Sequence, residues 1–160
     1  MKDLPIKRVP APAFDVDDPA VRSAVDEAMK DAGIGLAVVH GSRARGSARP
    51  SSDLDVAVLG RDSRPLPYSR MGLLAADLSR LLSSEVDVSD LATPDAIFRF
   101  EVVRCAKLLY QDRPDAFSDF VAKTLIDYND IQRFLPELIA GVARAAHRAS
   151  DTDPDRGVDK

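Results

Sequence analysis

The sequence predicts an α/β (α+β) fold in a single domain, and three observations support this. Short β-branched apolar runs, at 36–39 and 56–59, have the length and composition of buried strands. Segments with apolar residues at helical spacing alternate with these runs, and the last of them, 114–149, is long. The chain has 160 residues and a mass of 17.3 kDa, which is enough for one hydrophobic core.

Turn and cap residues place the helices. Proline suits the first turn of a helix, and an aspartate side chain accepts the free backbone N–H groups there. The first helix is therefore expected to begin at Pro19 behind Asp18 and to end at Gly33. Proline inside a helix removes a hydrogen-bond donor, so we expect a break or kink near Pro136. Two more helices are predicted, over residues 68–83 and 94–104.

A third strand is predicted over 85–91, where apolar and polar residues alternate. Val86 and Val88 would face the core, whereas Glu85, Asp87 and Ser89 would point to the opposite side. Residues 107–110 have the pattern of a short last strand.

The ends of the chain differ from its middle. We expect 1–18 to form an irregular lead-in, 19–149 the domain with its C-terminal interaction helices, and the polar residues 150–160 a disordered tail. Residues 1–12 have no continuous apolar core like that of a secretion signal, and no apolar run approaches membrane-spanning length. These features predict a cytoplasmic protein that does not engage a membrane.

Charge and cysteine content narrow the function classes. A formal net charge of -4 argues against broad, sequence-independent nucleic-acid binding, so no direct nucleic-acid partner is expected. Arg43, Arg45 and Arg49 are nevertheless close together in sequence, which suits a small anionic ligand. The single cysteine, Cys105, excludes an intramolecular disulfide and a cysteine zinc cluster, and its apolar neighbours predict a buried thiol.

The stretch 38–59 carries the residues that point to chemistry. Gly41 and Ser42 supply a tight turn between two predicted strands, and a helix opening at Ser42 would direct free backbone N–H groups at an anion. Asp53 and Asp55 are two residues apart, so on a strand their carboxylates would project from the same face. A phosphate-binding turn beside such carboxylates is typical of a metal–nucleotide site.

Asp87 adds a third carboxylate from a later strand. Three carboxylates can hold two divalent cations while nucleotide phosphates complete the oxygen shells. The simpler interpretation is that Asp53 and Asp55 solubilise an edge strand while Gly41 closes a turn. The joint occurrence of these features in this order favours the nucleotide site.

The other polar residues around the turn have more than one interpretation. Arg43 and Arg45 could contact phosphates or an acidic partner, or be ordinary surface arginines. His40 could contact a nucleotide, but we favour a packed or hydrogen-bonded histidine, and His147 suits the end of the last helix. No Ser-His-Asp order or paired-histidine motif supports a hydrolase.

Apolar residues follow one side of the final helical segment over 117–145. So long a stripe exceeds what a domain of this size needs for its core, which favours docking of a partner or self-association. The alternative is that the stripe packs entirely on the sheet. Its members are Phe117, Phe120, Val121, Thr124, Leu125, Tyr128, Ile131, Leu135, Leu138, Ile139, Val142 and Ala145.

Several segments resemble the minimal nucleotidyltransferases (MNT) of the polymerase-beta superfamily. Gly41-Ser42-Arg43-Ala44-Arg45-Gly46 followed by Ser52-Asp53-Leu54-Asp55 is similar to the superfamily signature. Residues 86–91 are similar to the strand that carries the third carboxylate, and 108–130 resembles the C-terminal segment of the family. The resemblance spans 31–138.

The resemblance implies a polymerase-beta-like fold, in which helices flank a small mixed sheet. It also implies that Asp53, Asp55 and Asp87 are catalytic and bind magnesium, with two ions expected, and that ATP is the nucleotide donor. The residues implied to lie at the nucleotide are Gly41, Ser42, Arg43 and Arg45, with Ser42 near the phosphates.

MNT proteins are commonly the antitoxin of a pair whose toxin is a HEPN-domain ribonuclease. The resemblance therefore implies transfer of AMP from ATP to a tyrosine of that toxin, which inactivates it, within a hetero-oligomer. One alternative is an antitoxin that inhibits by binding and masking alone. Another, with less support, is a transferase for a small molecule such as an aminoglycoside, because the short chain leaves little room for a second acceptor-binding domain.

Overall fold

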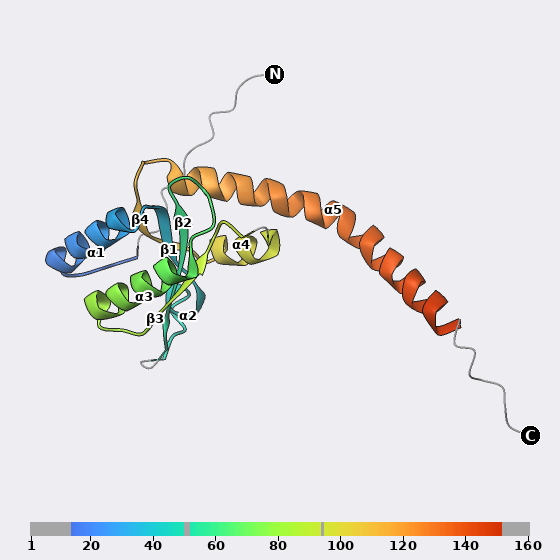
Figure 1. Cartoon of the computed structure of the whole chain (residues 1–160), viewed down its shortest axis with the longest axis horizontal. Coiled ribbons are helices and arrows are strands. Elements are labelled where there is room, and N and C mark those ends of the chain that lie inside the picture. Colours follow the sequence, from blue (N-terminus) through green and yellow to red (C-terminus); the bar gives the residue numbers. More distant parts are fainter. Residues whose placement is uncertain (1–13, 50–51, 94, 152–160) are drawn as a thin grey trace, which may run out of the picture.

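The computed structural model describes residues 14–49, 52–93 and 95–151. They form a four-stranded sheet with helices on both faces and one long helix that leaves the domain (Figure 1). Most of the expected lead-in (1–13) and most of the expected tail (152–160) lie outside the described residues.

The sheet is mixed, as the resemblance implies. Its strands are β1 (Ile34–Val39), β2 (Leu54–Gly60), β3 (Val86–Asp90) and β4 (Lys107–Gln111), in the spatial order β3-β2-β1-β4. β1 pairs antiparallel with β2 and β4, whereas β2 and β3 are parallel and are joined through helix α3 (Tyr68–Leu82). Parallel neighbours require such a crossover. The four predicted strands are thus confirmed, with small differences at their ends.

Apolar side chains cover both faces of the sheet. On one face, α1 (Pro19–Asp31) and α3 pack against β1 and β2 through buried residues such as Met29 and Leu78. On the other face, α4 (Ala96–Val103) and the first turns of α5 (Ala116–Asp151) contribute Val102 and Phe120. Figure 1 shows the first pair of helices on one side of the sheet and α4 on the other. The domain therefore has three layers.

The predicted start of α1 is confirmed. Pro19 is its first residue, and the Asp18 side chain accepts a hydrogen bond from the Ala20 N–H at 2.8 Å. The helix ends just before Gly33, which adopts a φ of +71° and lets the chain turn directly into β1.

Helix α4 begins later than predicted. Asp95 caps it by accepting hydrogen bonds from the N–H groups of Ile97 and Phe98, so the first helical residue is Ala96. Pro94, the predicted start, lies outside the described residues. An aspartate that can bond two free N–H groups fixes the helix start more strongly than the proline beside it.

Helix α5 is one continuous helix of 36 residues that includes Pro136, so of the expected break or kink near this proline the break does not occur. Figure 1 shows it curving away from the sheet. The helix extends to Asp151, two residues into the segment expected to be a disordered tail. The described residues contain no helix that is both long and apolar enough to span a membrane.

Only the first part of the α5 stripe packs on the sheet. Phe120 is 8% exposed and Thr124 is fully buried, whereas three stripe residues further along, and Phe134 outside the stripe, are 60–66% exposed. The alternative in which the whole stripe packs on the sheet is therefore wrong. The four exposed residues, which we call the distal α5 patch, are Phe134, Leu138, Ile139 and Val142.

The core packing predicts a contrast within α3. Leu78 is fully buried and Leu73 is 70% exposed on the same helix. We expect Leu78→Ala to lower the free energy of unfolding by about 2–5 kcal/mol, because it removes apolar contacts and leaves a cavity. Leu73→Ala should change it by less than about 0.5 kcal/mol. Urea unfolding followed by circular dichroism measures both, and equal losses would contradict the packing described here.

Candidate functional site

The pairing of β2 with β3 puts two carboxylates side by side. Asp55 and Asp87 are register partners in this parallel pair, and directly paired residues point to the same face of a sheet. Their neighbours Leu54, Val56 and Val86 are buried in the core on the opposite face. Asp55 is half-buried, and Asp87, on the outer strand, is exposed.

The glycine turn after β1 lies against the same carboxylate. The His40 N–H donates to the Asp55 carbonyl oxygen at 3.0 Å, which fastens the turn to the start of β2. Gly41 has a φ of +68°, and a Cβ added there would lie 2.1 Å from Asp55 Oδ2. Glycine is therefore required for its backbone conformation and for the close approach of the Asp55 carboxylate.

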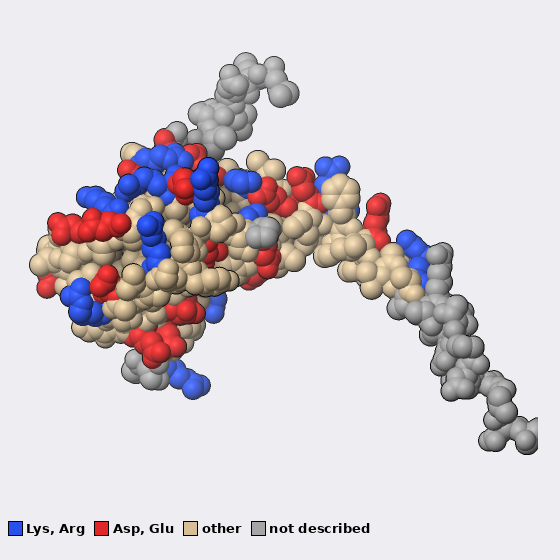
Figure 2. All heavy atoms as spheres, in the orientation of Figure 1, with Lys and Arg blue, Asp and Glu red and all other residues tan. Residues whose placement is uncertain are grey.

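A single helical turn, α2 (Gly41–Ala44), follows at once. Ser42, its second residue, is half-buried, so the helix begins at Gly41, one residue before the predicted opening at Ser42. Acidic side chains gather near this end of the domain, around α2 and β3 (Figure 2). The site is thus an acidic sheet edge beside a glycine-led turn.

His40 packs beside the carboxylates. Its ring meets the Phe98 ring of α4 edge-on, with centroids 6.2 Å apart and an angle of 87° between the planes. Burial lowers the pKa of His40. The negative charges of Asp55 and Asp87 oppose that shift, and the positive charge of Arg45 adds to it. The ring is therefore neutral at pH 7, and its interpretation as a packed histidine is confirmed.

Asp53 lies just before β2 and is exposed. Strand alternation puts it on the same face as Asp55, because the residue between them, Leu54, is buried on the other face. Within the described part of the chain, no three Asp, Glu, His or Cys side chains are close enough to form a ready-made metal cage. The fold thus brings Asp55 and Asp87 together, whereas Asp53 lies one residue before the start of β2.

The two arginines that follow the turn have different environments. Arg43 donates through Nε and Nη2 to the Ser52 carbonyl oxygen, at 3.0 and 2.6 Å, and through Nη2 to Ser84 Oγ at 3.0 Å. These bonds tie α2 to the segment before β2 and to the segment before β3. Arg43 therefore holds the two strands in place instead of presenting a free guanidinium.

Arg45 is exposed, and its charge acts on His40. Its Nη1 lies 3.8 Å from the sulfur of Cys105. That thiol is half-buried, so the prediction of a buried thiol is wrong. The cysteine lies where α4 gives way to β4, and this junction is more open than its apolar neighbours suggested. Of the two arginines, Arg45 is thus the exposed one.

Phe98 was not among the residues that sequence reasoning assigned to the site. The sequence predicts a helix around it, but no spacing marks one aromatic residue of that helix as special. Its position follows from a contact across the fold, with His40, which is 58 residues earlier in the chain.

The chain matches the family model described as polymerase beta, nucleotidyltransferase over residues 24–115. It is also 31% identical over 117 residues to the protein adenylyltransferase MntA of Shewanella oneidensis. That match covers 71% of this chain and 82% of the relative.

Solved structures agree with the sequence matches. A toxin–antitoxin structure with AMP-PNP contains a chain that matches with a TM-score of 0.62 and 27% identity, covering 76% of this chain and 98% of that one. A structure of tri-AMPylated Shewanella oneidensis HEPN toxin in complex with MNT antitoxin contains a chain that matches with a TM-score of 0.58 and 25% identity, covering 78% of this chain and 97% of that one. The chain described here belongs to the polymerase beta nucleotidyltransferase family, and within it to the minimal nucleotidyltransferases of the MntA type.

Proposed function

We propose that this protein is the antitoxin of a HEPN/MNT pair and transfers AMP from ATP to a tyrosine of its HEPN ribonuclease toxin, inactivating it. The observation that carries the proposal is the Asp55–Asp87 pair beside the Gly41 turn. The relatives named above, a protein adenylyltransferase and the MNT antitoxin of an AMPylated HEPN toxin, support the same reaction.

The residues at the acidic edge fit magnesium. Two carboxylates on paired strands repel each other unless a cation lies between them, and carboxylate oxygens are the ligands that Mg²⁺ prefers. The missing Cβ of Gly41 keeps the Asp55 oxygen accessible from the turn. We assign Asp55 and Asp87 as the core of this site and Asp53 as a third ligand. Bound magnesium would neutralise phosphate charge and lower the pKa of the attacking hydroxyl.

The side chains of this protein bind and orient the reactants in the proposed reaction. Ser42 and the backbone of the glycine turn hold the ATP phosphates, and Arg45 offers them a positive charge. Arg43 acts indirectly by holding the segment before Asp53 in place. This refines the sequence interpretation, in which the two arginines were equivalent.

The proposed chemical step breaks a phosphoanhydride bond of ATP and forms a phosphodiester bond to the tyrosine. The tyrosine oxygen forms a bond to the α-phosphorus of ATP while the bond from that phosphorus to the pyrophosphate oxygen breaks. Pyrophosphate leaves, and the hydroxyl proton passes through the exposed Asp87 carboxylate to solvent. Fixed charges and positioning supply the rate enhancement.

The distal α5 patch is the proposed docking surface for the toxin. Leu138, Ile139 and Val142 occupy one side of the helix, because residues three and four apart are neighbours on a helix surface. Figure 2 shows this part of α5 as mostly uncharged surface interrupted by single charged residues. An exposed apolar helix face fits a groove between the helices of a partner. The patch also favours the alternative in which binding alone inhibits the toxin.

Removing one metal ligand separates catalysis from masking. We expect Asp55→Asn to lower AMP transfer by on the order of 100- to 1,000-fold, because the cation loses a charged ligand at the centre of the site. Transfer is measured with labelled ATP, magnesium and the cognate HEPN toxin. Asp77→Asn, at an exposed position on α3, is the matched control and should be fully active. An Asp55→Asn protein that still neutralises the toxin at equal stoichiometry would instead support masking.

Two glycines with the same backbone conformation test the role of the turn. Gly41 and Gly46 have φ angles of +68° and +71°, but a Cβ on Gly46 would meet no atom within 4 Å. Alanine at either position should cost about 1 kcal/mol of stability. Only Gly41→Ala displaces the Asp55 carboxylate, so we expect it alone to lower transfer, by about 100-fold. Labelling rates at equal folded concentration measure this, and equal activity of the two variants would exclude the close approach as a requirement.

A charge in the distal α5 patch should weaken toxin binding. Leu138→Asp puts a carboxylate into the proposed apolar contact, and we expect an affinity loss of roughly 30-fold. Leu73→Asp, at an equally exposed leucine on α3, is the control and should bind normally. Isothermal titration calorimetry measures toxin affinity, and fluorescence titration checks that nucleotide affinity is unchanged. Normal toxin binding by Leu138→Asp would place the interface elsewhere.

A further inference from the structure

Three consecutive residues of α4 connect the acidic edge to α5. Phe98 meets the His40 ring at the turn, as described above. Phe100 stacks on Tyr128 of α5, with ring centroids 3.7 Å apart and planes 6° from parallel. The residue between them, Arg99, reaches α5 through an ion pair. α4 is thus in contact with both the candidate site and the base of the long helix.

The ion pair is largely shielded from water. Arg99 Nη2 donates to Asp127 Oδ2 at 2.8 Å, and the two side chains are only 12% and 28% exposed. Lys123 adds a second cation to the same carboxylate at 3.0 Å. A shielded, charge-assisted hydrogen bond of this kind fixes geometry more than it adds stability.

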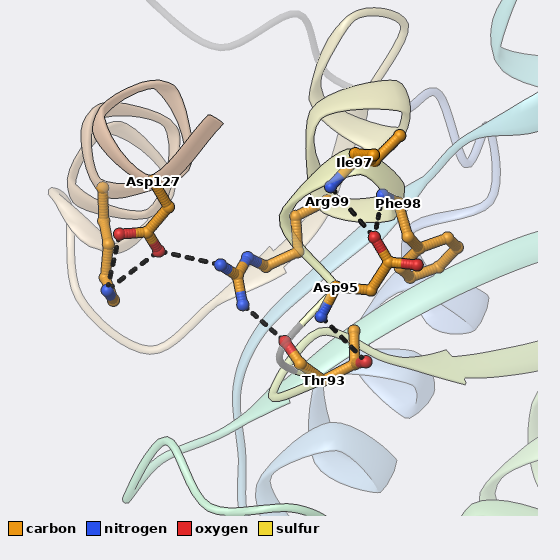
Figure 3. Close-up of polar contacts among 7 residues, drawn as sticks. Thr93, Asp95, Ile97, Phe98, Arg99 and Asp127 are labelled. Carbon is orange, nitrogen blue, oxygen red and sulfur yellow. Dashed lines mark hydrogen bonds and ion pairs between the residues drawn. The ribbon is translucent and has the colours of Figure 1, made fainter. Parts of the chain in front are cut away.

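Arg99 also holds the segment that follows β3. Its Nη1 donates to the Thr93 carbonyl oxygen, while Asp95 caps the start of α4 (Figure 3). Figure 3 shows the guanidinium lying between Thr93 and Asp127, with one nitrogen directed at each. One planar side chain therefore joins three segments: the connection from the strand of Asp87, helix α4 and helix α5. A lysine, with a single nitrogen, cannot reproduce this two-sided contact.

We propose that Arg99 is a positioning residue for transfer to a docked protein: it fixes the direction of α5 relative to the turn and carboxylates of the site. The inference rests on the proposed function, because α5 is there the helix that holds the acceptor. Docking on the distal patch sets where the acceptor hydroxyl arrives only if the base of the helix is rigid. An error of about 1 Å at the reacting atoms can cost on the order of 100-fold in rate.

The test compares two arginines that each pair with an aspartate of α5. Arg99→Met keeps most of the apolar stem and removes the guanidinium. Arg113→Met is the matched control, because Arg113 pairs with Asp119 at 2.6 Å in an exposed position, with side chains 57% and 59% exposed. Arg99→Lys keeps the positive charge but cannot donate to Thr93 and Asp127 from two nitrogens at once. Full-length variants are first checked for a native circular dichroism spectrum and melting transition.

We expect Arg99→Met to lower kcat for AMP transfer to the HEPN toxin by about 10- to 100-fold, with toxin and nucleotide affinities unchanged. Arg99→Lys should recover part of the rate, and Arg113→Met should match the wild type. Equal kcat for Arg99→Met and Arg113→Met would overturn the proposal. It would also be overturned if nucleotide affinity fell as much as kcat, because Arg99 would then act on the nucleotide.

Hydrogen exchange gives a readout that does not depend on transfer activity. In Arg99→Met, we expect faster amide exchange both at the base of α5, over 124–128, and at the turn, over 40–44, with no such change in Arg113→Met. Loss of protection in α5 alone would overturn the coupling. A wild-type protein that transfers no AMP to its toxin would refute the proposed function, and this exchange pattern would still decide whether Arg99 links the two regions.

Discussion

The parallel pairing of β2 with β3 is the constraint on which the rest of the site depends. It puts Asp55 next to Asp87 on one face of the sheet while Leu54, Val56 and Val86 fill the core on the other face. Shifting this register by one residue would turn the carboxylates into the core and the apolar residues into water. Burial of the apolar side chains therefore holds two mutually repelling acids together, and the negative charge that they concentrate suits the cation of the proposed magnesium site.

Much of this arrangement can be predicted from the sequence, because the relevant signals are local. Asp18 and Pro19 mark a helix start by chemistry that needs no distant partner, and the alternation around Asp87 reveals which side of its strand it occupies. Contacts across the fold carry no such signal. Arg43 and Arg45 look equivalent in sequence, yet one is bonded to Ser52 and the other is exposed.

Helix α5 has a buried first part and an exposed distal part. The first turns of α5 are buried against the sheet and α4, whereas the distal patch is open to a partner. At about 1.5 Å per residue its 36 residues extend roughly 54 Å, so docking can take place well away from the acidic edge. Pro136 lies inside this helix without ending it.

The outer position of β3 has a consequence for solubility. An outer strand presents unpaired backbone groups that can recruit a strand from another molecule, and charged side chains discourage such pairing. Asp87 and its exposed neighbour Glu85 supply negative charge along this border. The carboxylate that we assign to the proposed reaction thus also disfavours edge-to-edge pairing with another molecule, so one side chain would serve two purposes.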